Sequence, residues 1–156
     1  MEYRTVFDVS QNGFSWAWPL IIALFASVFA LTGWAMRKSN ESGYLFKGIA
    51  FQCFGAFGVI FGLLYLASNY VVIRDYSKAL SNSDCAVAEG TVSDFVPMPP
   101  GGHAEESFRI NETRFSYGSG WGSLVFNSEW NRGFLRNGVR ARITYRGEDI
   151  LKVEVQ

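Results

Sequence analysis

The residue types best suited to chemistry gather in one stretch, PMPPGGHAEESF at 97–108, which holds the only histidine of the chain. A zinc site needs three or four ligands, and His103 with Glu105 and Glu106 supplies a fragment of one. Adjacent glutamates in an extended strand point to opposite faces. Three prolines and two glycines in the same stretch predict a bent connection between strands. We therefore expect an architectural or partner-binding loop, with a metal or catalytic site as the alternative.

Other catalytic patterns are missing from the sequence. Nucleophilic catalysis needs a base beside a serine or cysteine, and His103 is the single candidate base of that type. There is no glycine loop with the lysine that binds phosphates. Cys53 and Cys85 lie in segments of different character, so we expect two unpaired thiols. The sequence predicts a protein that is not an enzyme and holds no cofactor or metal.

Arginine and tryptophan mark a second region of interest near the C-terminus. Five arginines lie between 132 and 146 with no acid among them, yet basic and acidic residues balance at 14 each over the chain. This balance argues against nucleic acid and favours a solvated strand face or contact with anionic headgroups. Two tryptophans nearby could bind a partner, close a small core or dock on a membrane. The candidate partner-binding residues are His103, Trp121, Trp130, Arg140 and Arg142.

Two uncharged stretches predict membrane-spanning helices at about 17–36 and 48–73, within a region 16–74. The first, Pro19–Met36, has 18 residues and would run ~27 Å as a helix, close to the ~30 Å of a bilayer core. The second has 26 residues. A buried pair of core helices is the alternative, but so short a chain has too little material to cover both. The lipid bilayer is therefore an expected partner.

Flanking charges predict an orientation. Arg37, Lys38 and Lys47 lie in the link between the two stretches, whereas the N-terminal segment has only Arg4. The positive-inside rule places that link in the cytoplasm and both termini outside, which is the periplasm if the source is a bacterium with two membranes. The basic residues follow the first stretch, which is the reverse of a secretory signal.

Small residues predict where the helices pack. Gly58 and Gly62 form a G-x-x-x-G pair, and Gly55 lies on a related face. Their partner is either the first helix, through Ala23, Ala26 and Ala30, or a second copy of the chain. Neither span contains an acidic or basic residue, so a transporter or pump is not expected.

The remaining chain, 86–156, changes to a period of two and predicts a soluble all-β domain. The clearest strands are 86–96, a hairpin over 106–117, a short strand GSLVFN at 122–127, and a hairpin from Val139 to Val155. Five short strands in about 70 residues favour a five-stranded barrel resembling the oligonucleotide fold, or a sandwich. The N-terminal segment 1–15 is expected on this domain, because Tyr3, Thr5, Phe7 and Val9 alternate as an added strand would.

A resemblance adds to this interpretation. The segments EGTVSDFVPMPPGGHAEESF, FSY and GVRARITYRGEDILKVE resemble a family of uncharacterised bacterial membrane proteins with two spans and a C-terminal β domain. That family brings no established activity and no catalytic residues. More distantly, two spans before a five-stranded barrel resemble NfeD-like proteins, which carry an oligonucleotide-fold domain and associate with stomatin-type scaffolds.

Two classes of function follow from these observations. The first is a non-enzymatic protein of the bacterial inner membrane, an accessory or scaffold subunit that binds another protein or a second copy through its β domain and helices. The second is a metal-binding or hydrolytic envelope enzyme that uses the His103 loop.

Overall fold

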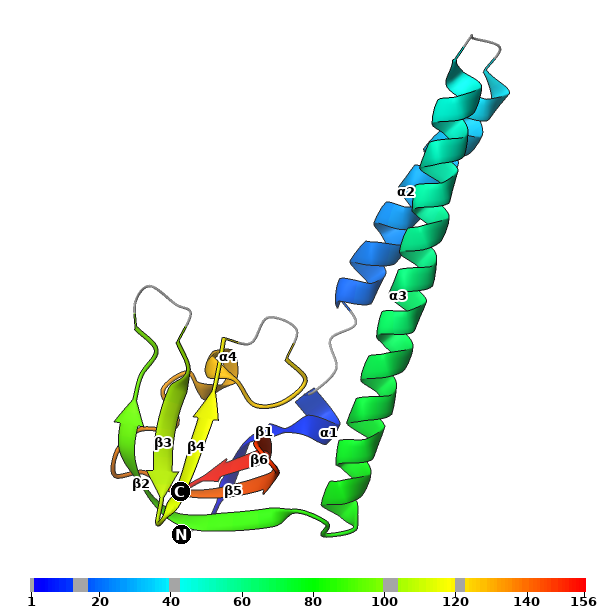
Figure 1. Ribbon diagram of the computed structural model, residues 1–156. Helices are drawn as coiled ribbons and strands as arrows, with labels where there is room; N and C mark the ends of the chain where they lie inside the picture. The colour runs from blue at the N-terminus through cyan, green and yellow to red at the C-terminus, as the bar shows by residue number, and fades with distance from the viewer. Residues whose placement is uncertain (1, 13–16, 40–42, 100–103, 120–122) are drawn as a thin grey trace. The chain divides into compact units, whose positions relative to one another are not determined.

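The computed structural model describes residues 2–12, 17–39, 43–99, 104–119 and 123–156 (Figure 1). The chain divides into two compact units. One comprises Met1–Phe14 and Val72–Gln156, and we call it the sheet unit; the other, Ser15–Val71, is the helix unit. The helix that leaves the helix unit continues into the sheet unit without a break.

The helix unit is built from α2 (Ala17–Lys38) and the larger part of α3 (Tyr44–Ser81). Both helices are long and apolar enough to cross a membrane, and few of their side chains are buried. Both extend beyond the predicted ends. The prediction stopped at residue 73, before the first charged residue, but α3 continues through Arg74 and Lys78, because arginine and lysine are good helix formers. The helix ends near Ser83, whose φ of 57° is left-handed.

The sheet unit is a six-stranded antiparallel sheet in the order β1-β6-β5-β2-β3-β4. Its strands are β1 (Arg4–Asp8), β2 (Ala86–Val96), β3 (Glu106–Ile110), β4 (Thr113–Tyr117), β5 (Arg140–Arg146) and β6 (Asp149–Val155). Two one-turn helices, α1 (Val9–Asn12) and α4 (Ser128–Asn131), accompany them. The two predicted hairpins are present as β3–β4 and β5–β6, and the expected N-terminal strand is present as β1, paired with β6.

Strand β2 bends the sheet, so that the sheet surrounds the hydrophobic core of the sheet unit. Its first half, Ala86–Thr91, pairs with β5, and its second half pairs with β3. The register shifts between Ser93 and Val96, where Asp94 has a φ of 50°, so a bulge sharpens the twist there. The core lies between the two halves and includes Phe7, Phe108, Ile143 and Val153, each at most 1% exposed.

The predicted five-stranded barrel is wrong, because the sheet stays open. No pairing joins its edge strands β1 and β4 among the described residues. Instead Phe126 fills the space between them: its ring lies 5.6 Å from that of Phe7 on β1 and 4.9 Å from that of Tyr117 on β4. One apolar side chain therefore replaces the strand pairing that a closed barrel needs. The oligonucleotide-fold barrel implied by the resemblance to NfeD-like proteins is not formed.

The short strand predicted at 122–127 is also wrong for the residues described there, which are irregular. This segment crosses from β6 to β4 and makes single bridging bonds. Phe126 donates its N–H to the carbonyl of Ile150 at 3.1 Å, and Ser128 donates to Gly118 at 3.1 Å. Asn127 then caps α4 through its side chain, which ends any extended run.

The last turns of α3 pack on the sheet within the sheet unit. Ala79 is 5% exposed, and Tyr76 and Leu80 contact the core cluster. The Tyr76 hydroxyl donates to the Asp149 carboxylate at 2.6 Å, and Arg146 binds Asp75 at 2.8 Å. These contacts fix the start of the polar part of the chain against the β5–β6 hairpin.

Candidate binding surfaces

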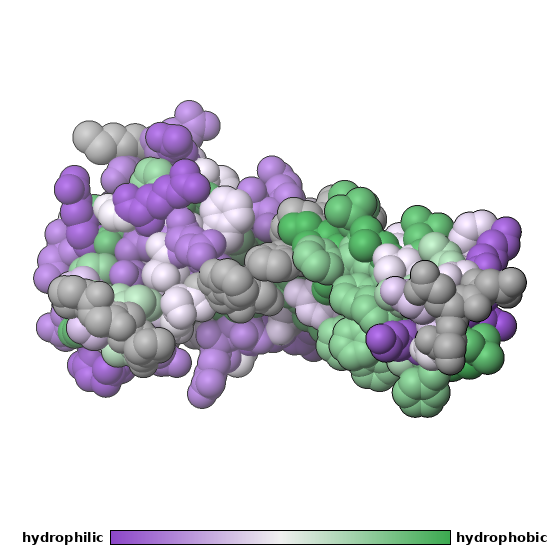
Figure 2. Space-filling model, turned by 90° about the horizontal axis from the view of Figure 1, so that it is seen from above, coloured by the Kyte–Doolittle hydropathy of each residue, from purple (hydrophilic) through white to green (hydrophobic). Residues whose placement is uncertain are grey.

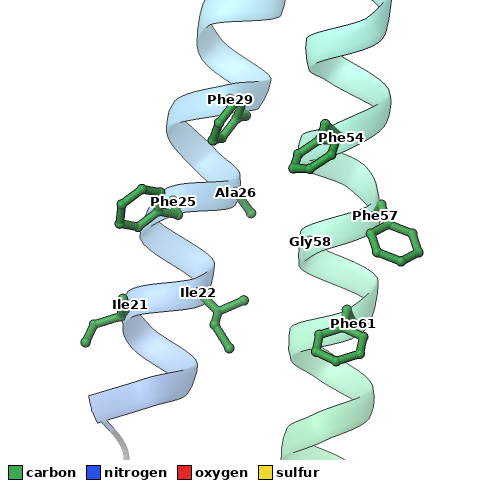
Figure 3. A pocket seen from close by; sticks show the side chains of 9 residues that line it. All are labelled: Ile21, Ile22, Phe25, Ala26, Phe29, Phe54, Phe57, Gly58 and Phe61. Carbon is green, nitrogen blue, oxygen red and sulfur yellow. The ribbon is translucent and has the colours of Figure 1, made fainter.

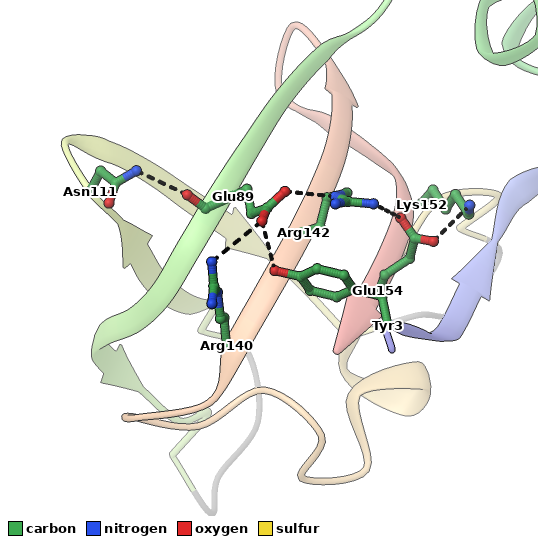
Figure 4. Close-up of polar contacts among 7 residues, drawn as sticks. All are labelled: Tyr3, Glu89, Asn111, Arg140, Arg142, Lys152 and Glu154. Atoms are coloured by element: carbon green, nitrogen blue, oxygen red, sulfur yellow. Dashed lines mark hydrogen bonds and ion pairs between the residues drawn. The ribbon is translucent and has the colours of Figure 1, made fainter. Parts of the chain in front are cut away.

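A network of charged residues covers the outer face of β2, β5 and β6 (Figure 4). The Arg142 guanidinium lies 2.8 Å from the Glu89 carboxylate, and Arg140 lies 3.6 Å from it. The Tyr3 hydroxyl donates to the same carboxylate at 3.0 Å. The strand register explains this grouping, because Glu89 and Arg142 are directly opposite in the β2–β5 pair.

The network continues across β6 and is nearly balanced in charge. Arg142 also approaches Glu154 at 4.0 Å, and Lys152 binds Glu154 at 3.0 Å. The hydrogen bond from Arg142, then that from Tyr3, lowers the pKa of Glu89. The two arginines that the sequence offered as partner-binding residues, Arg140 and Arg142, thus already have an acid, which weakens any use of them as an anion site.

The other predicted site residues fall in different surroundings. Trp130 is half-buried, and its ring lies 5.3 Å from that of Phe7, so it packs against the core. His103 and Trp121 lie outside the described residues. The arginine cluster is dispersed, because Arg146 binds Asp75 and Arg132 donates to the carbonyl of Glu129 at 3.2 Å. Among the described candidates, the structure brings Arg140 and Arg142 together at Glu89 and packs Trp130 against the core.

The glycines form the seam of the helix unit. A Cβ added at Gly55 would lie 2.8 Å from the carbonyl oxygen of Ala26 and 2.9 Å from the amide nitrogen of Ala30. At Gly58 and Gly62 the nearest atoms belong to side chains of α2, at 3.2 Å. All three glycines therefore face α2, in agreement with packing inside one chain.

The closest approach in this seam was missed by the sequence analysis. A Cβ at Gly33 would lie 2.6 Å from the carbonyl oxygen of Gly48, and one at Gly48 would lie 2.7 Å from that of Gly33. A signal was present, because glycines recur every seven residues at 48, 55 and 62, the repeat of a helix–helix seam. The backbones of α2 and α3 thus approach closely along one stripe.

Beside this seam is an apolar groove of about 350 Å³ (Figure 3). Five phenylalanines line it, together with Ile21, Ile22, Ala26 and Gly58; they are Phe25 and Phe29 of α2 and Phe54, Phe57 and Phe61 of α3. The groove has almost no polar lining, so it can receive hydrocarbon and offers no group for catalysis.

The outer edge of β4 is a further surface that sequence reasoning did not identify. The two-residue turn at Asn111 and Glu112 makes Ile110 and Thr113 a hydrogen-bonded pair, so the backbone groups of Arg114 and Ser116 point away from β3. No described residue bonds to these outward groups. The edge is therefore an open template for pairing.

The side chain of Arg114 on this edge also has no acidic partner in the part of the chain that the structure describes. It lies directly opposite Arg109 of β3, and Asp94 is 3.9 Å from Arg109. Arg114 itself contacts only the Ser107 hydroxyl, at 3.4 Å, among the described residues. Like charges opposite one another on a sheet are destabilising, and the repulsion here is only partly relieved.

Groups that could hold a metal are not found in the described part of the chain: no cluster there contains three or more His, Cys, Asp or Glu side chains. Cys53 and Cys85 are free thiols, as expected from the sequence. Burial, and then the charge of Asp84, raises the pKa of the Cys85 thiol, which disfavours the reactive thiolate. Comparison with protein-family models, curated proteins and solved structures finds no match for this chain.

Proposed function

We propose that this chain is a non-enzymatic protein of the bacterial inner membrane, an accessory or scaffold subunit that α2 and α3 anchor and whose sheet unit binds another protein. The observation that carries the membrane part is the exposed surface of the helix unit. Phe46 is 79% exposed, and Leu24 and Phe57 are each 67% exposed. In Figure 2 the apolar surface gathers over the helices, whereas polar side chains cover the sheet unit.

A soluble monomer would not expose an apolar surface of this extent to water. Isolated exposed apolar residues are normal, but contiguous patches beyond a few hundred Å² mark contact with protein or lipid. The exposed large apolar side chains of α2 and α3 form a run from Leu20 to Val72. The small residues of α2 and α3 pack the two helices against each other. The large apolar side chains on their outer surfaces are therefore suited to contact with lipid.

Strand pairing supports two crossings. Strand β1 precedes both helices and pairs with β6, which follows both. Such pairing requires the two ends to lie on one side of a membrane, and two spans satisfy this whereas one would not. Cation–π pairs mark the opposite end of the hairpin: Lys38 lies 4.1 Å from the Trp34 ring and Lys47 lies 5.6 Å from the Tyr44 ring. Aromatic and basic residues of this kind prefer the headgroup region.

The orientation follows from charge. Arg37, Lys38 and Lys47 favour a cytoplasmic link, which would make the sheet unit periplasmic. Single cysteines at Ser42 and at Ser119, in a background with Cys53→Ala and Cys85→Ser, test it. An impermeant maleimide added to intact cells should label the second position only; labelling of the first alone would reverse the topology.

Membrane insertion itself is tested by extraction of cell membranes. The protein should stay in the pellet after alkaline carbonate and be released by mild detergent. A matched variant with Leu24→Arg and Phe57→Arg, two exposed positions on different helices, should lose this behaviour or fail to accumulate. Release of the unaltered protein by carbonate would refute the proposal.

The scaffold part rests on what the sheet unit offers. Among the described residues its β4 edge has no strand partner, so its backbone groups are suited to contacts with another protein. Cross-linking in intact cells, followed by purification in mild detergent, should retain one partner in fixed ratio. The enzyme alternative stays a prediction, because His103 lies outside the described residues.

A further inference from the structure

We infer that the β4 edge binds an extended segment of a partner protein as a seventh strand, with an acidic residue of that segment placed against Arg114. This inference deepens the proposed function and rests on it. The site consists of the outward backbone groups of Arg114 and Ser116 together with the Arg114 guanidinium.

The backbone supplies the affinity. An incoming antiparallel strand would exchange N–H and C=O bonds with Arg114 and Ser116, which have no partner among the described residues. The edge stays accessible, because Arg114 and Ser116 are both exposed while Phe115 between them is buried in the core. The buried ring holds the strand rigid, so little ordering would be needed on binding.

The charge supplies the specificity. A residue of the incoming strand directly opposite Arg114 would lie on the same outer face as Arg109 and Asp94. A carboxylate at that position would be the acidic neighbour of Arg114, as Asp94 is the acidic neighbour of Arg109. The repulsion between the two arginines that face each other would then be relieved on both sides.

A second copy of the chain does not meet this requirement. Strand β4 reads TRFSY and contains no acid, so two β4 edges paired together would set Arg114 against neutral or like-charged side chains. The other open edge, β1, carries one acid, Asp8, but its carboxylate already accepts a hydrogen bond from the Ser10 N–H at 2.8 Å. A heterologous partner with an acidic extended segment is therefore the occupant that the edge fits.

The first test uses the full-length protein in detergent and a labelled peptide, Ser-Thr-Val-Glu-Val-Thr-Gly-Ser, measured by fluorescence polarisation. Arg114→Glu should weaken its binding by about 5-fold or more, and a peptide with Lys in place of Glu should recover affinity for that variant alone. The matched control, Arg136→Glu, changes an exposed arginine of a loop and should leave binding unchanged.

Strand pairing is separated from simple ionic attraction by Ser116→Pro. This variant removes one outward N–H and no bond to β3, so the fold should persist, while peptide binding should fall by about 10-fold or more. In the unaltered protein, hydrogen exchange at Arg114 and Ser116 should slow when the peptide binds. Unchanged binding in Ser116→Pro, or no exchange protection, would mean that the edge does not pair and would overturn the inference. Absence of binding to the unaltered protein would overturn it as well.

Different results would contradict the proposed scaffold function and the β4 inference. If a cross-linked partner co-purifies equally with the unaltered chain, Arg114→Glu and Ser116→Pro, the scaffold function stands and the β4 inference falls. If no partner co-purifies with the unaltered chain, the scaffold function itself falls. Loss of the partner in Ser116→Pro, with retention in Arg136→Glu, would support both.

Discussion

Replacing Gly55 with alanine should separate α2 from α3, because the new methyl group would meet backbone and not side chain. Its Cβ would lie 2.8 Å from the Ala26 carbonyl oxygen, whereas ordinary contacts begin at 3.4 Å. The helices must therefore part by roughly 0.6 Å at this point. Overpacking of this kind costs about 1–3 kcal/mol, and the better helix propensity of alanine returns at most about 1 kcal/mol. We expect a net loss of up to about 2 kcal/mol in the stability of the helix pair.

Gly62→Ala is the matched control, because its Cβ would meet the Ile22 Cγ2 atom at 3.2 Å, and that side chain can move. Its stability should stay within about 0.5 kcal/mol of the unaltered chain. The stability of both variants is measured by unfolding in mixed micelles of increasing dodecyl sulfate content. Energy transfer between labels on the two helices monitors their separation. Equal stability of both would refute the backbone-contact argument. A loss of dimer with an intact helix pair would instead show that the glycines serve a second copy.

Three further predictions concern the sheet unit and the opening loop. The pKa of Glu89 is lowered in the folded state, so its ionised carboxylate contributes stability above the ordinary pKa of 4.5, and this stability is lost as pH falls through the folded pKa. Thermal unfolding measured between pH 6 and 3 should show this loss. The variant Glu89→Gln should show a smaller dependence of stability on pH. Phe126→Ala should destabilise the sheet unit by about 3–5 kcal/mol in chemical denaturation, with Phe126→Leu much milder, because the ring closes the gap between the edge strands. His103→Ala should leave metal content unchanged in elemental analysis; stoichiometric zinc lost in this variant would move the enzyme alternative to the front.

The sequence predicted those elements whose signal is local. The two uncharged stretches, the hairpin around Asn111 and the strand at Arg4–Asp8 each have a periodicity that appears within one short window. The open sheet could not be predicted in this way. Whether β1 and β4 meet depends on the crossing segment, where Phe126 inserts between residues far away in the chain.

The candidate sites show the same division. Gly55, Gly58 and Gly62 on α3 were identified because their spacing is a property of one helix, whereas the contact between Gly33 and Gly48 was missed. Arg140 and Arg142 were expected to contact a partner, and only the β2–β5 register shows that Glu89 lies directly opposite Arg142. That Arg114 has no acidic partner among the described residues likewise depends on which strand ends the sheet, and a single sequence carries no record of that order.

The pairing of β1 with β6 has a consequence for how the chain is made. Strand β1 is synthesised first, but its partner begins at Asp149, so at about 5–20 residues per second β1 waits roughly 7–30 s before β6 is made. During that interval both helices emerge, while Phe7 has no core to enter. The sheet can therefore be completed only after the entire segment between β1 and β6 has been synthesised. A chain stopped before Asp149 would leave β1 without a partner and β5 paired on one side only, and quality-control proteases could recognise the exposed strand.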